Sequence, residues 1–213
     1  MSLISDMRVH YDRSPLEESS VDPDGMKQFH TWFEEASNAD ILEPNAMTLS
    51  TINAEGFPSS RIVLLKGLEP EAFIFYTNYE SDKGQQISKN PNISLLFLWK
   101  ALHRQVRIQG VATKMTKEES ESYFHTRPKG NQIGAWVSPQ SRIIESKQFL
   151  ADRKAALIEQ YKDADQLPLP DFWGGYRVIP SVIEYWQGQP NRLHDRLRYT
   201  RTDEGWKIDR IAP

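Results

Sequence analysis

The hydrophobic positions of the chain follow a helical period near its start and a strand period over most of the rest. Asp24 is a typical helix N-cap, and apolar residues recur after it with the spacing of one helix face, at Phe29, Trp32, Phe33 and Ala36. This pattern predicts an amphipathic helix that ends near residue 39. From Ala46 onward the period changes, which predicts strands at 47–53, 60–66, 72–77, 93–99 and 104–115.

Helical patterns interrupt and follow these strands. A short helix is expected before Pro91, at 81–90, and further helices are expected at 117–125, 132–137 and 146–162. Strand patterns return at 176–186, 196–202 and 206–211. Short strands separated by turn-forming residues are typical of an antiparallel barrel or sandwich. The sequence therefore predicts a mainly β fold of the α+β class, with a closed or nearly closed antiparallel sheet and helices around it.

The first 24 residues differ in character from the rest of the chain. They are polar, contain Pro15 and Pro23, and show no sustained period, so we expect a flexible N-terminal arm that orders on a ligand. Residues 25–213 contain no linker-like stretch, and a chain of 213 residues is near the upper size of one domain. We therefore expect a single domain at 25–213.

The composition of the chain argues against several classes of function. The net charge of −3 argues against a nucleic-acid partner, and the absence of cysteine excludes disulfides, thiolate metal sites and a cysteine nucleophile. The histidines lack metal-ligand spacing, and no glycine-rich phosphate loop is present, which disfavours a Rossmann enzyme. No apolar run approaches the roughly 20 residues needed to cross a bilayer. We expect a cytoplasmic protein with no metal and no membrane partner.

Three potentially cationic side chains occur close together near the C-terminus. If residues 192–196 are extended, Arg192, His194 and Arg196 share one face of a strand, and an anion placed among them would relieve their repulsion. The alternative is a solvated strand face on which Asp195 is the counter-charge. The aromatic and amide residues at 185–191, which include Trp186, favour a site for a planar anionic ligand.

Two further stretches place cations where phosphates could bind. On a regular strand, Arg61 and Lys66 would lie about 16 Å apart on opposite faces, so they would serve two anions or one elongated ligand. The alternative is a buried strand with solvated ends. Tyr123 and Arg127 are four residues apart and should converge at the end of a helix, since Pro128 follows. A phenol and a guanidinium together make a good phosphate clamp.

Taken in order, these and other segments resemble the pyridoxine/pyridoxamine 5′-phosphate oxidase family. The resemblance runs from the N-terminal arm to the last residues. It rests on Arg61-Ile-Val-Leu-Leu-Lys66, Phe75-Tyr-Thr-Asn78, Arg104-Gln-Val-Arg107, Tyr123-Phe-His-Thr-Arg-Pro128, Gln132-Ile-Gly-Ala-Trp-Val-Ser138, Trp186-Gln-Gly188, Asn191-Arg-Leu-His-Asp-Arg196 and the ending Trp206-Lys-Ile-Asp-Arg-Ile-Ala-Pro213. It implies an FMN-binding split β-barrel and a homodimer with FMN at the subunit interface.

The resemblance also implies site residues. Those expected to bind FMN are Arg61, Ile62, Val63, Leu64, Leu65, Lys66, Tyr76, Thr77, Lys83, Gln105, Gln140, Ser141, Trp186 and Arg196. Those expected to hold the substrate and its phosphate are Arg8, Tyr11, Lys66, Tyr123, Arg127, Asn131, Arg192 and His194. Arg192 and His194 are the predicted catalytic pair, and whether His194 moves a proton stays open. Asp82 and Asn131 depart from the family, which usually has a basic residue at the first position and often a serine at the second.

The function implied is FMN-dependent oxidation of pyridoxamine 5′-phosphate and pyridoxine 5′-phosphate to pyridoxal 5′-phosphate. Oxygen would be the acceptor, with hydrogen peroxide as product and ammonia released from the amine. Two alternatives are a related split-barrel flavin reductase and a non-catalytic module that binds FMN or pyridoxal phosphate. Tyr123, Arg127, Arg192 and His194 favour the oxidase, because a reductase needs no second phosphate clamp.

Overall fold

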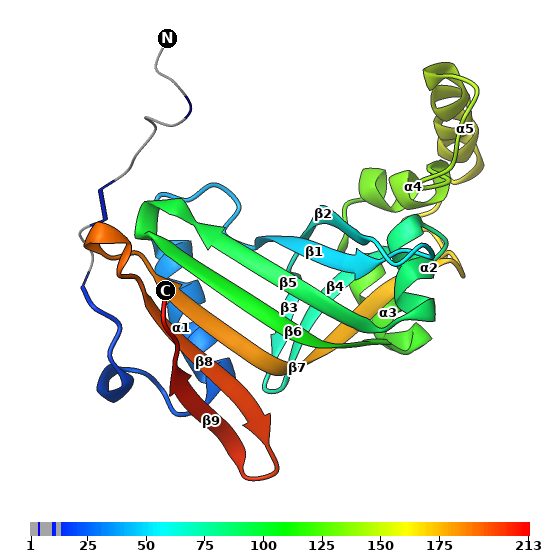
Figure 1. The fold of residues 1–213 in the computed structure, drawn as a ribbon. Helices are drawn as coiled ribbons and strands as arrows, with labels where there is room; N and C mark the ends of the chain where they lie inside the picture. Colours follow the sequence, from blue (N-terminus) through cyan, green and yellow to red (C-terminus); the bar gives the residue numbers. More distant parts are fainter. Residues whose placement is uncertain (1–3, 5–9, 12–13) are drawn as a thin grey trace. The chain divides into compact units, whose positions relative to one another are not determined.

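The computed structural model describes residue 4, residues 10 and 11, and residues 14–213. Arg8, which the sequence predicted as a substrate contact, lies outside these residues. The described chain forms a nine-stranded sheet with the order β2-β1-β5-β6-β7-β4-β3, and β8 and β9 are added through β7 (Figure 1). The pairs β3–β4, β4–β7, β7–β8 and β8–β9 are antiparallel. The prediction of a mainly β fold with antiparallel pairing is confirmed.

The elements follow the predicted order with small shifts at their ends. The strands are β1 (Ala46–Ile52), β2 (Pro58–Leu64), β3 (Gly67–Glu69), β4 (Ala72–Asn78), β5 (Asn92–Trp99), β6 (Arg104–Lys114), β7 (Trp173–Gln187), β8 (Asp195–Thr202) and β9 (Gly205–Arg210). The α-helices are α1 (Gly25–Asn38), α2 (Asp82–Lys89), α3 (Lys117–Thr126), α4 (Lys129–Val137) and α5 (Lys147–Gln160). Short 3-10 turns are η2 (Glu18–Ser20), η3 (Lys100–Leu102) and η4 (Pro190–Arg192). No helix of the described residues is long and apolar enough to span a membrane.

The chain divides into two compact units. Unit 1 consists of Met1–Leu49, Ser94–Gly110 and Pro180–Pro213, and unit 2 consists of Ser50–Ile93 and Val111–Ile179. Strands β1, β5, β6 and β7 contribute residues to both units. The division into an arm at 1–24 and one domain at 25–213 stays a prediction.

The core of unit 1 forms around α1. Asp24 caps this helix by accepting hydrogen bonds from two backbone N–H groups, as predicted. The apolar face of the helix is buried: Phe29 lies 5.1 Å from Phe97, and Trp32 meets the edge of Tyr185 at 5.1 Å between ring centroids. The Tyr185 hydroxyl donates to the carbonyl at the first residue of the helix at 2.6 Å. These contacts attach α1 to strands β5 and β7 of the same unit.

Residues just before α1 are attached to the β8–β9 ribbon. Leu16 is buried; its N–H donates to the Asp195 carboxylate at 3.0 Å, and its carbonyl accepts from the Arg210 guanidinium at 2.7 Å. Arg210 also donates to the two carboxylate oxygens of Glu18 at 2.8 and 2.6 Å. The described part of the predicted arm is therefore fixed to β9 largely through one guanidinium.

The core of unit 2 has two parts. Strands β4 and β7 pair with Phe75 opposite Tyr176 and bury a run of apolar residues between them. A second cluster lies around Phe124 of α3 and Trp173, and α5 packs against its edge through Leu150 and Leu157. Figure 1 shows α4 and α5 side by side at this end of the unit. Both helices thus belong to the part of the core around Phe124 and Trp173.

Candidate functional site

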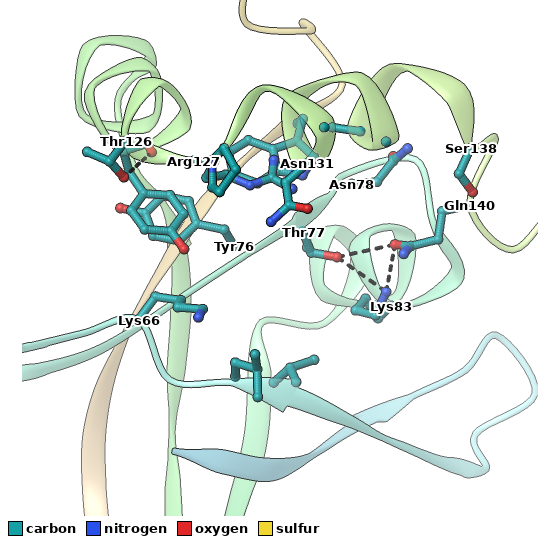
Figure 2. A pocket seen from close by; sticks show the side chains of 18 of the residues that line it. Lys66, Tyr76, Thr77, Asn78, Lys83, Thr126, Arg127, Asn131, Ser138 and Gln140 are labelled. Carbon is teal, nitrogen blue, oxygen red and sulfur yellow. Dashed lines mark hydrogen bonds between the residues drawn. The ribbon is translucent and has the colours of Figure 1, made fainter. Parts of the chain in front are cut away.

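A cavity of about 660 Å³ opens in unit 2 (Figure 2). Its volume lies within the range of small-molecule sites. Its cationic residues are Lys66, Lys83 and Arg127, and none of the described residues that line it is acidic. The lining consists of Ile62, Val63, Leu64, Lys66, Tyr76, Thr77, Asn78, Lys83, Tyr123, Thr126, Arg127, Pro128, Gly130, Asn131, Gly134, Ala135, Ser138, Gln140 and Trp173. The charge balance suits an anionic ligand.

One end of the cavity is built around Lys83, in the first turn of α2. Ser81 caps this helix, and the Lys83 ammonium donates to the side-chain oxygens of Thr77 (3.2 Å), Ser81 (3.2 Å) and Gln140 (2.9 Å). The position beside a helix N-terminus favours a bound anion. Burial, together with a neighbouring guanidinium, lowers the pKa of Lys83 to about 8. A bound phosphate would raise that pKa again and keep the ammonium charged.

Arg61 lies next to this end. It donates to Ser59 at 2.7 Å and to Gln86 of α2 at 3.2 Å, and it faces Lys83 closely enough to lower the lysine pKa. Burial lowers the pKa of Arg61 itself, while Asp82 at the start of α2 opposes both shifts. Two desolvated cations side by side repel each other, and an anion placed between them would relieve the repulsion.

The other end of the cavity is aromatic. The rings of Tyr76 and Tyr123 stack at 3.7 Å, and Trp173 stacks on Tyr76 at 5.5 Å. The Arg127 guanidinium lies 4.6 Å from the Trp173 ring centre, a cation–π contact. Burial raises the pKa of Tyr76 to about 12, so its hydroxyl stays protonated and can donate.

Arg127 has an unused hydrogen-bond donor at this end. Its Nη1 is buried and, within the part of the chain that the structure describes, has no hydrogen-bond partner. A buried donor left unpaired costs about 1–3 kcal/mol. Arg127 is the C-cap of α3, and Tyr123 lies one turn earlier, so the predicted convergence of these two side chains is confirmed. This end therefore offers a second anion position.

Figure 2 shows the two positions apart: Lys83, Thr77 and Gln140 are grouped at one end, while Lys66, Tyr76 and Arg127 lie toward the other. The prediction that Arg61 and Lys66 belong to one regular strand is wrong, because β2 ends at Leu64. The Lys66 N–H instead donates to the Ile74 carbonyl, which turns the chain into β3. This turn carries Lys66 to the wall of the cavity.

Some predicted residues do not line the cavity. Leu65 is buried in the core, and Ser141 lies in a turn with a positive φ of 69°, whereas Ser138 does line the cavity. Trp173 was missed by the sequence analysis. Gly174 follows it, and a Cβ there would lie 2.2 Å from the Tyr79 hydroxyl, but this crowding arises from the fold and gives no signal in the sequence.

The remaining predicted residues meet in unit 1. Trp186 and Arg196 lie directly opposite each other in the β7–β8 ladder. The Gly188 N–H donates to the His103 carbonyl at 2.8 Å, so continuing this antiparallel register by two residues brings Gln105 beside Trp186. The rings of Tyr11 and His194 lie 5.4 Å apart, and those of Trp186 and His194 lie 4.6 Å apart. Four of the predicted ligands thus surround the indole.

The predicted common face of Arg192, His194 and Arg196 is wrong. Pro190 begins the η4 turn, and Asn191 and Arg192 both have left-handed backbone angles, with φ of 56° and 64°. Strand β8 therefore starts only at Asp195. Backbone of this kind costs roughly 1–2 kcal/mol per non-glycine residue, and strain of this sort clusters at functional sites.

His194 has a defined tautomer in this turn. The Gln189 N–H donates to its Nδ1 at 3.0 Å, so the neutral ring carries its proton on Nε2. Burial and the nearby Arg192 lower the pKa of His194, with Asp195 opposing them. Near neutral pH the imidazole is thus an uncharged donor through Nε2.

Solved structures with the same fold show the class of protein to which this chain belongs. A pyridoxamine 5′-phosphate oxidase-related, FMN binding protein from Nostoc punctiforme PCC 73102 shares the fold, with a TM-score of 0.71, 15% identity, and coverage of 89% of this chain and 98% of that chain. PhzG from Burkholderia lata 383, in complex with tetrahydrophenazine-1-carboxylic acid, has a TM-score of 0.89 and 27% identity over 96% of this chain and 100% of that chain. The fold is the FMN-binding split β-barrel.

Sequence comparison then gives the family. Residues 33–160 match the model of pyridoxamine 5′-phosphate oxidase, and residues 173–213 match that of the pyridoxine 5′-phosphate oxidase C-terminal dimerisation region. Pyridoxine/pyridoxamine 5′-phosphate oxidases from Salinibacter ruber and Burkholderia thailandensis are 52% and 49% identical, over 100% of both chains in each case. The chain belongs to the pyridoxine/pyridoxamine 5′-phosphate oxidase family of oxidoreductases, whose cofactor is FMN. The resemblance seen in the sequence is confirmed.

Proposed function

We propose that this chain oxidises pyridoxamine 5′-phosphate and pyridoxine 5′-phosphate to pyridoxal 5′-phosphate, with FMN as cofactor and O₂ as acceptor. The alcohol and O₂ give the aldehyde and H₂O₂. The amine, O₂ and water give the aldehyde, ammonia and H₂O₂. Two electrons and two protons leave the substrate in each case and appear in the peroxide.

The observation that supports this function is the pair of anion positions in one cavity without lining acids. The Lys83 end, with Arg61 beside it, fits the phosphate of FMN, because it offers two cations, hydroxyl groups and a helix N-terminus. The Arg127 end fits the substrate phosphate, because the buried Nη1 there needs an acceptor. A ligand with only one phosphate group would leave one position uncompensated.

When FMN is bound, it supplies the two-electron redox chemistry, while the chain binds, orients and excludes water. Lys66, Tyr123 and Arg127 hold the substrate phosphate, with Asn131 as an amide donor at the same wall. Arg192 orients the pyridine ring from its left-handed turn. His194 holds its proton on Nε2 and donates it in a hydrogen bond to a polar substituent of the substrate, so it is not the base.

We also propose that two copies of the chain associate, with FMN at the interface between them. Support comes from the match of residues 173–213 to a dimerisation region. In this arrangement Gln105, Trp186 and Arg196 of one copy contact the flavin bound in the cavity of the other. A mass measurement in solution tests the dimer, and a monomer that binds FMN tightly would reject it.

The function is tested with the purified protein. Its visible spectrum should show bound flavin, and pyridoxamine 5′-phosphate in air should give aldehyde and peroxide in equal amounts. Aldehyde formation without flavin would reject FMN as the cofactor of the reaction. Flavin reduction by a nicotinamide donor, with no turnover of either B6 phosphate, would reject the oxidase in favour of a reductase. Binding without peroxide would indicate a non-catalytic module.

The PhzG likeness names a second kind of ligand, one without a phosphate group. Oxidation of such a tricyclic carboxylic acid would need no Arg127 clamp. Unphosphorylated pyridoxamine and a reduced phenazine carboxylic acid therefore belong in the same assay. The proposed function requires the phosphorylated substrate to have much the highest kcat/KM.

A further inference from the structure

Glu184 is a buried acid that the proposed mechanism does not use. It lies within β7, its side chain is 6% exposed, and it is surrounded by arginines. Its Oε1 accepts from Nε and Nη2 of Arg196 at 3.0 and 2.8 Å. Arg107 lies 3.5 Å away, and Arg198, its partner in the β7–β8 register, lies at 4.0 Å. All four residues belong to unit 1.

The contacts of Arg196 fix the orientation of its guanidinium. Of its five N–H groups, two donate to Glu184, and a third, on Nη1, donates to the Ala212 carbonyl at 2.8 Å. One N–H on Nη1 and one on Nη2 remain for a ligand. Because the carboxylate holds one edge of the plane, these two donors keep a single direction.

Glu184 also lies close to the indole of Trp186. It is two residues from Trp186 in β7, so both side chains lie on the same face of the strand, and Arg196 is directly opposite Trp186 in β8. The carboxylate therefore holds Arg196 beside Trp186, and it screens the repulsion among three arginines in one patch. Without it, Arg196 would be drawn to other acceptors or turned away from Arg107 and Arg198.

We infer that Glu184 is a positioning residue for flavin binding: it orients Arg196 so that the two remaining N–H donors face the FMN bound in the cavity of the other copy. This inference rests on the proposed function, since the contact of Arg196 with flavin belongs to that proposal. An alternative is a purely structural ion pair between β7 and β8, which would affect folding and leave the flavin unchanged.

The test is FMN binding by Glu184→Gln, measured by the quenching of flavin fluorescence and by the visible circular dichroism of the bound flavin. The amide keeps the size and one acceptor oxygen but removes the charge. We expect FMN affinity to fall about tenfold, the loss of one charge-assisted interaction, and the dichroism to change. Arg196→Met should have a similar effect, and the double variant should lose little more, because both changes remove one interaction.

Glu69→Gln is the matched control. Glu69 also accepts two hydrogen bonds from one arginine, Arg177, at 2.7 and 2.9 Å, but it is more exposed than Glu184, lies in unit 2 and does not line the cavity. It should lose stability without a change in FMN affinity. If Arg196→Met weakens FMN binding and Glu184→Gln does not, the inference is overturned while the proposed function stands.

Other outcomes are also decisive. A wild-type protein that binds no FMN would reject the proposed function itself. If Glu184→Gln does not fold, Arg196→Lys replaces it, because lysine keeps the charge but lacks the two-pronged edge. Wild-type FMN affinity and dichroism in Arg196→Lys would overturn the inference.

Discussion

Lys83 and Gln140 are joined by a hydrogen bond of 2.9 Å from the ammonium to the amide oxygen, which ties the first turn of α2 to the loop after α4. Both side chains lie at one end of the cavity (Figure 2). The same burial that lowers the pKa of Lys83 to about 8 places its titration just above neutral pH. This makes the charge at the proposed flavin-phosphate position sensitive to pH.

We therefore expect FMN affinity to fall as pH rises through about 8. The anion prefers the protonated lysine, so affinity is fully present below the free-state pKa, and the dissociation constant rises by up to about tenfold per pH unit above it. Titration of FMN fluorescence between pH 7 and 9 measures this. Lys83→Met should bind weakly and lose the pH dependence, and a Lys83→Met protein with an unchanged pH profile would assign the titration to another group.

Asp82 should weaken flavin binding in this chain. It is the first residue of α2, next to Lys83, and its charge opposes an anion bound there. Asp82→Asn should improve FMN affinity about two- to fivefold at pH 7 and low salt, the size of one partly screened charge interaction. The effect should shrink at high salt. Glu80→Gln, an exposed acid two residues earlier, is the control, and an equal gain there would assign the effect to overall charge.

Arg127 should separate substrate binding from flavin binding. Arg127→Met removes the donor whose Nη1 has no partner among the described residues. A charge-assisted hydrogen bond contributes about 1.5–3 kcal/mol, so KM for pyridoxamine 5′-phosphate should rise roughly 10- to 100-fold. FMN affinity should stay the same, and Tm should not fall, because the buried charge is gone. A large loss of FMN affinity would place the flavin phosphate at this end.

Most elements of the fold could be predicted because their hydrophobic periods are regular. The α1 helix with its Asp24 cap and the α3 terminus at Arg127 follow directly from local rules. The short β3 strand could not be predicted, since it exists through pairing of Gly67 with Ile74, a contact set by the sheet. The local hydrophobic pattern predicts that a strand or helix forms, whereas pairing with neighbouring strands determines the residues at which a strand ends.

The candidate site shows the same limit. The cations were identifiable by type, but the left-handed turn at Asn191 and Arg192 was not, because neither residue is a glycine. That turn is closed by a side-chain contact from His194 to the Gln189 N–H, which periodicity does not encode. The role of Glu184 was missed for a related reason: the sequence shows a single acid in an apolar strand, and only the structure shows that it accepts a hydrogen bond from Arg196.

Arg192 should affect turnover far more than flavin binding. We expect Arg192→Ala to lower kcat/KM at least about 100-fold, since loss of positioning alone has effects of that size. FMN affinity should stay near the wild-type value. Arg192→Lys keeps the charge without the planar group and should restore only part of the activity. Unchanged kcat and KM in purified Arg192→Ala would remove this residue from the active site.

Arg210 should control how firmly the segment before α1 is attached. Its guanidinium binds both Glu18 oxygens, Asp195 and the Leu16 carbonyl, so Arg210→Met should expose residues 14–20 to protease and speed hydrogen exchange at the Leu16 N–H. Lys207→Met, which breaks an exposed pair with Asp209 on the same strand, is the control.

The attachment of the segment before α1 should also depend on pH. The hydrogen bond from Arg210 lowers the pKa of Glu18 to about 2 from an ordinary value of 4.5. A depressed carboxyl pKa stabilises the folded contact above the ordinary value, and the effect is lost as pH falls from about 4.5 toward 2. Protease sensitivity of residues 14–20 should therefore rise over that interval, measured with an acid-active protease. Glu18→Gln should be sensitive already at neutral pH, and a variant as resistant as the wild type would assign the attachment to Asp195 and the Leu16 carbonyl alone.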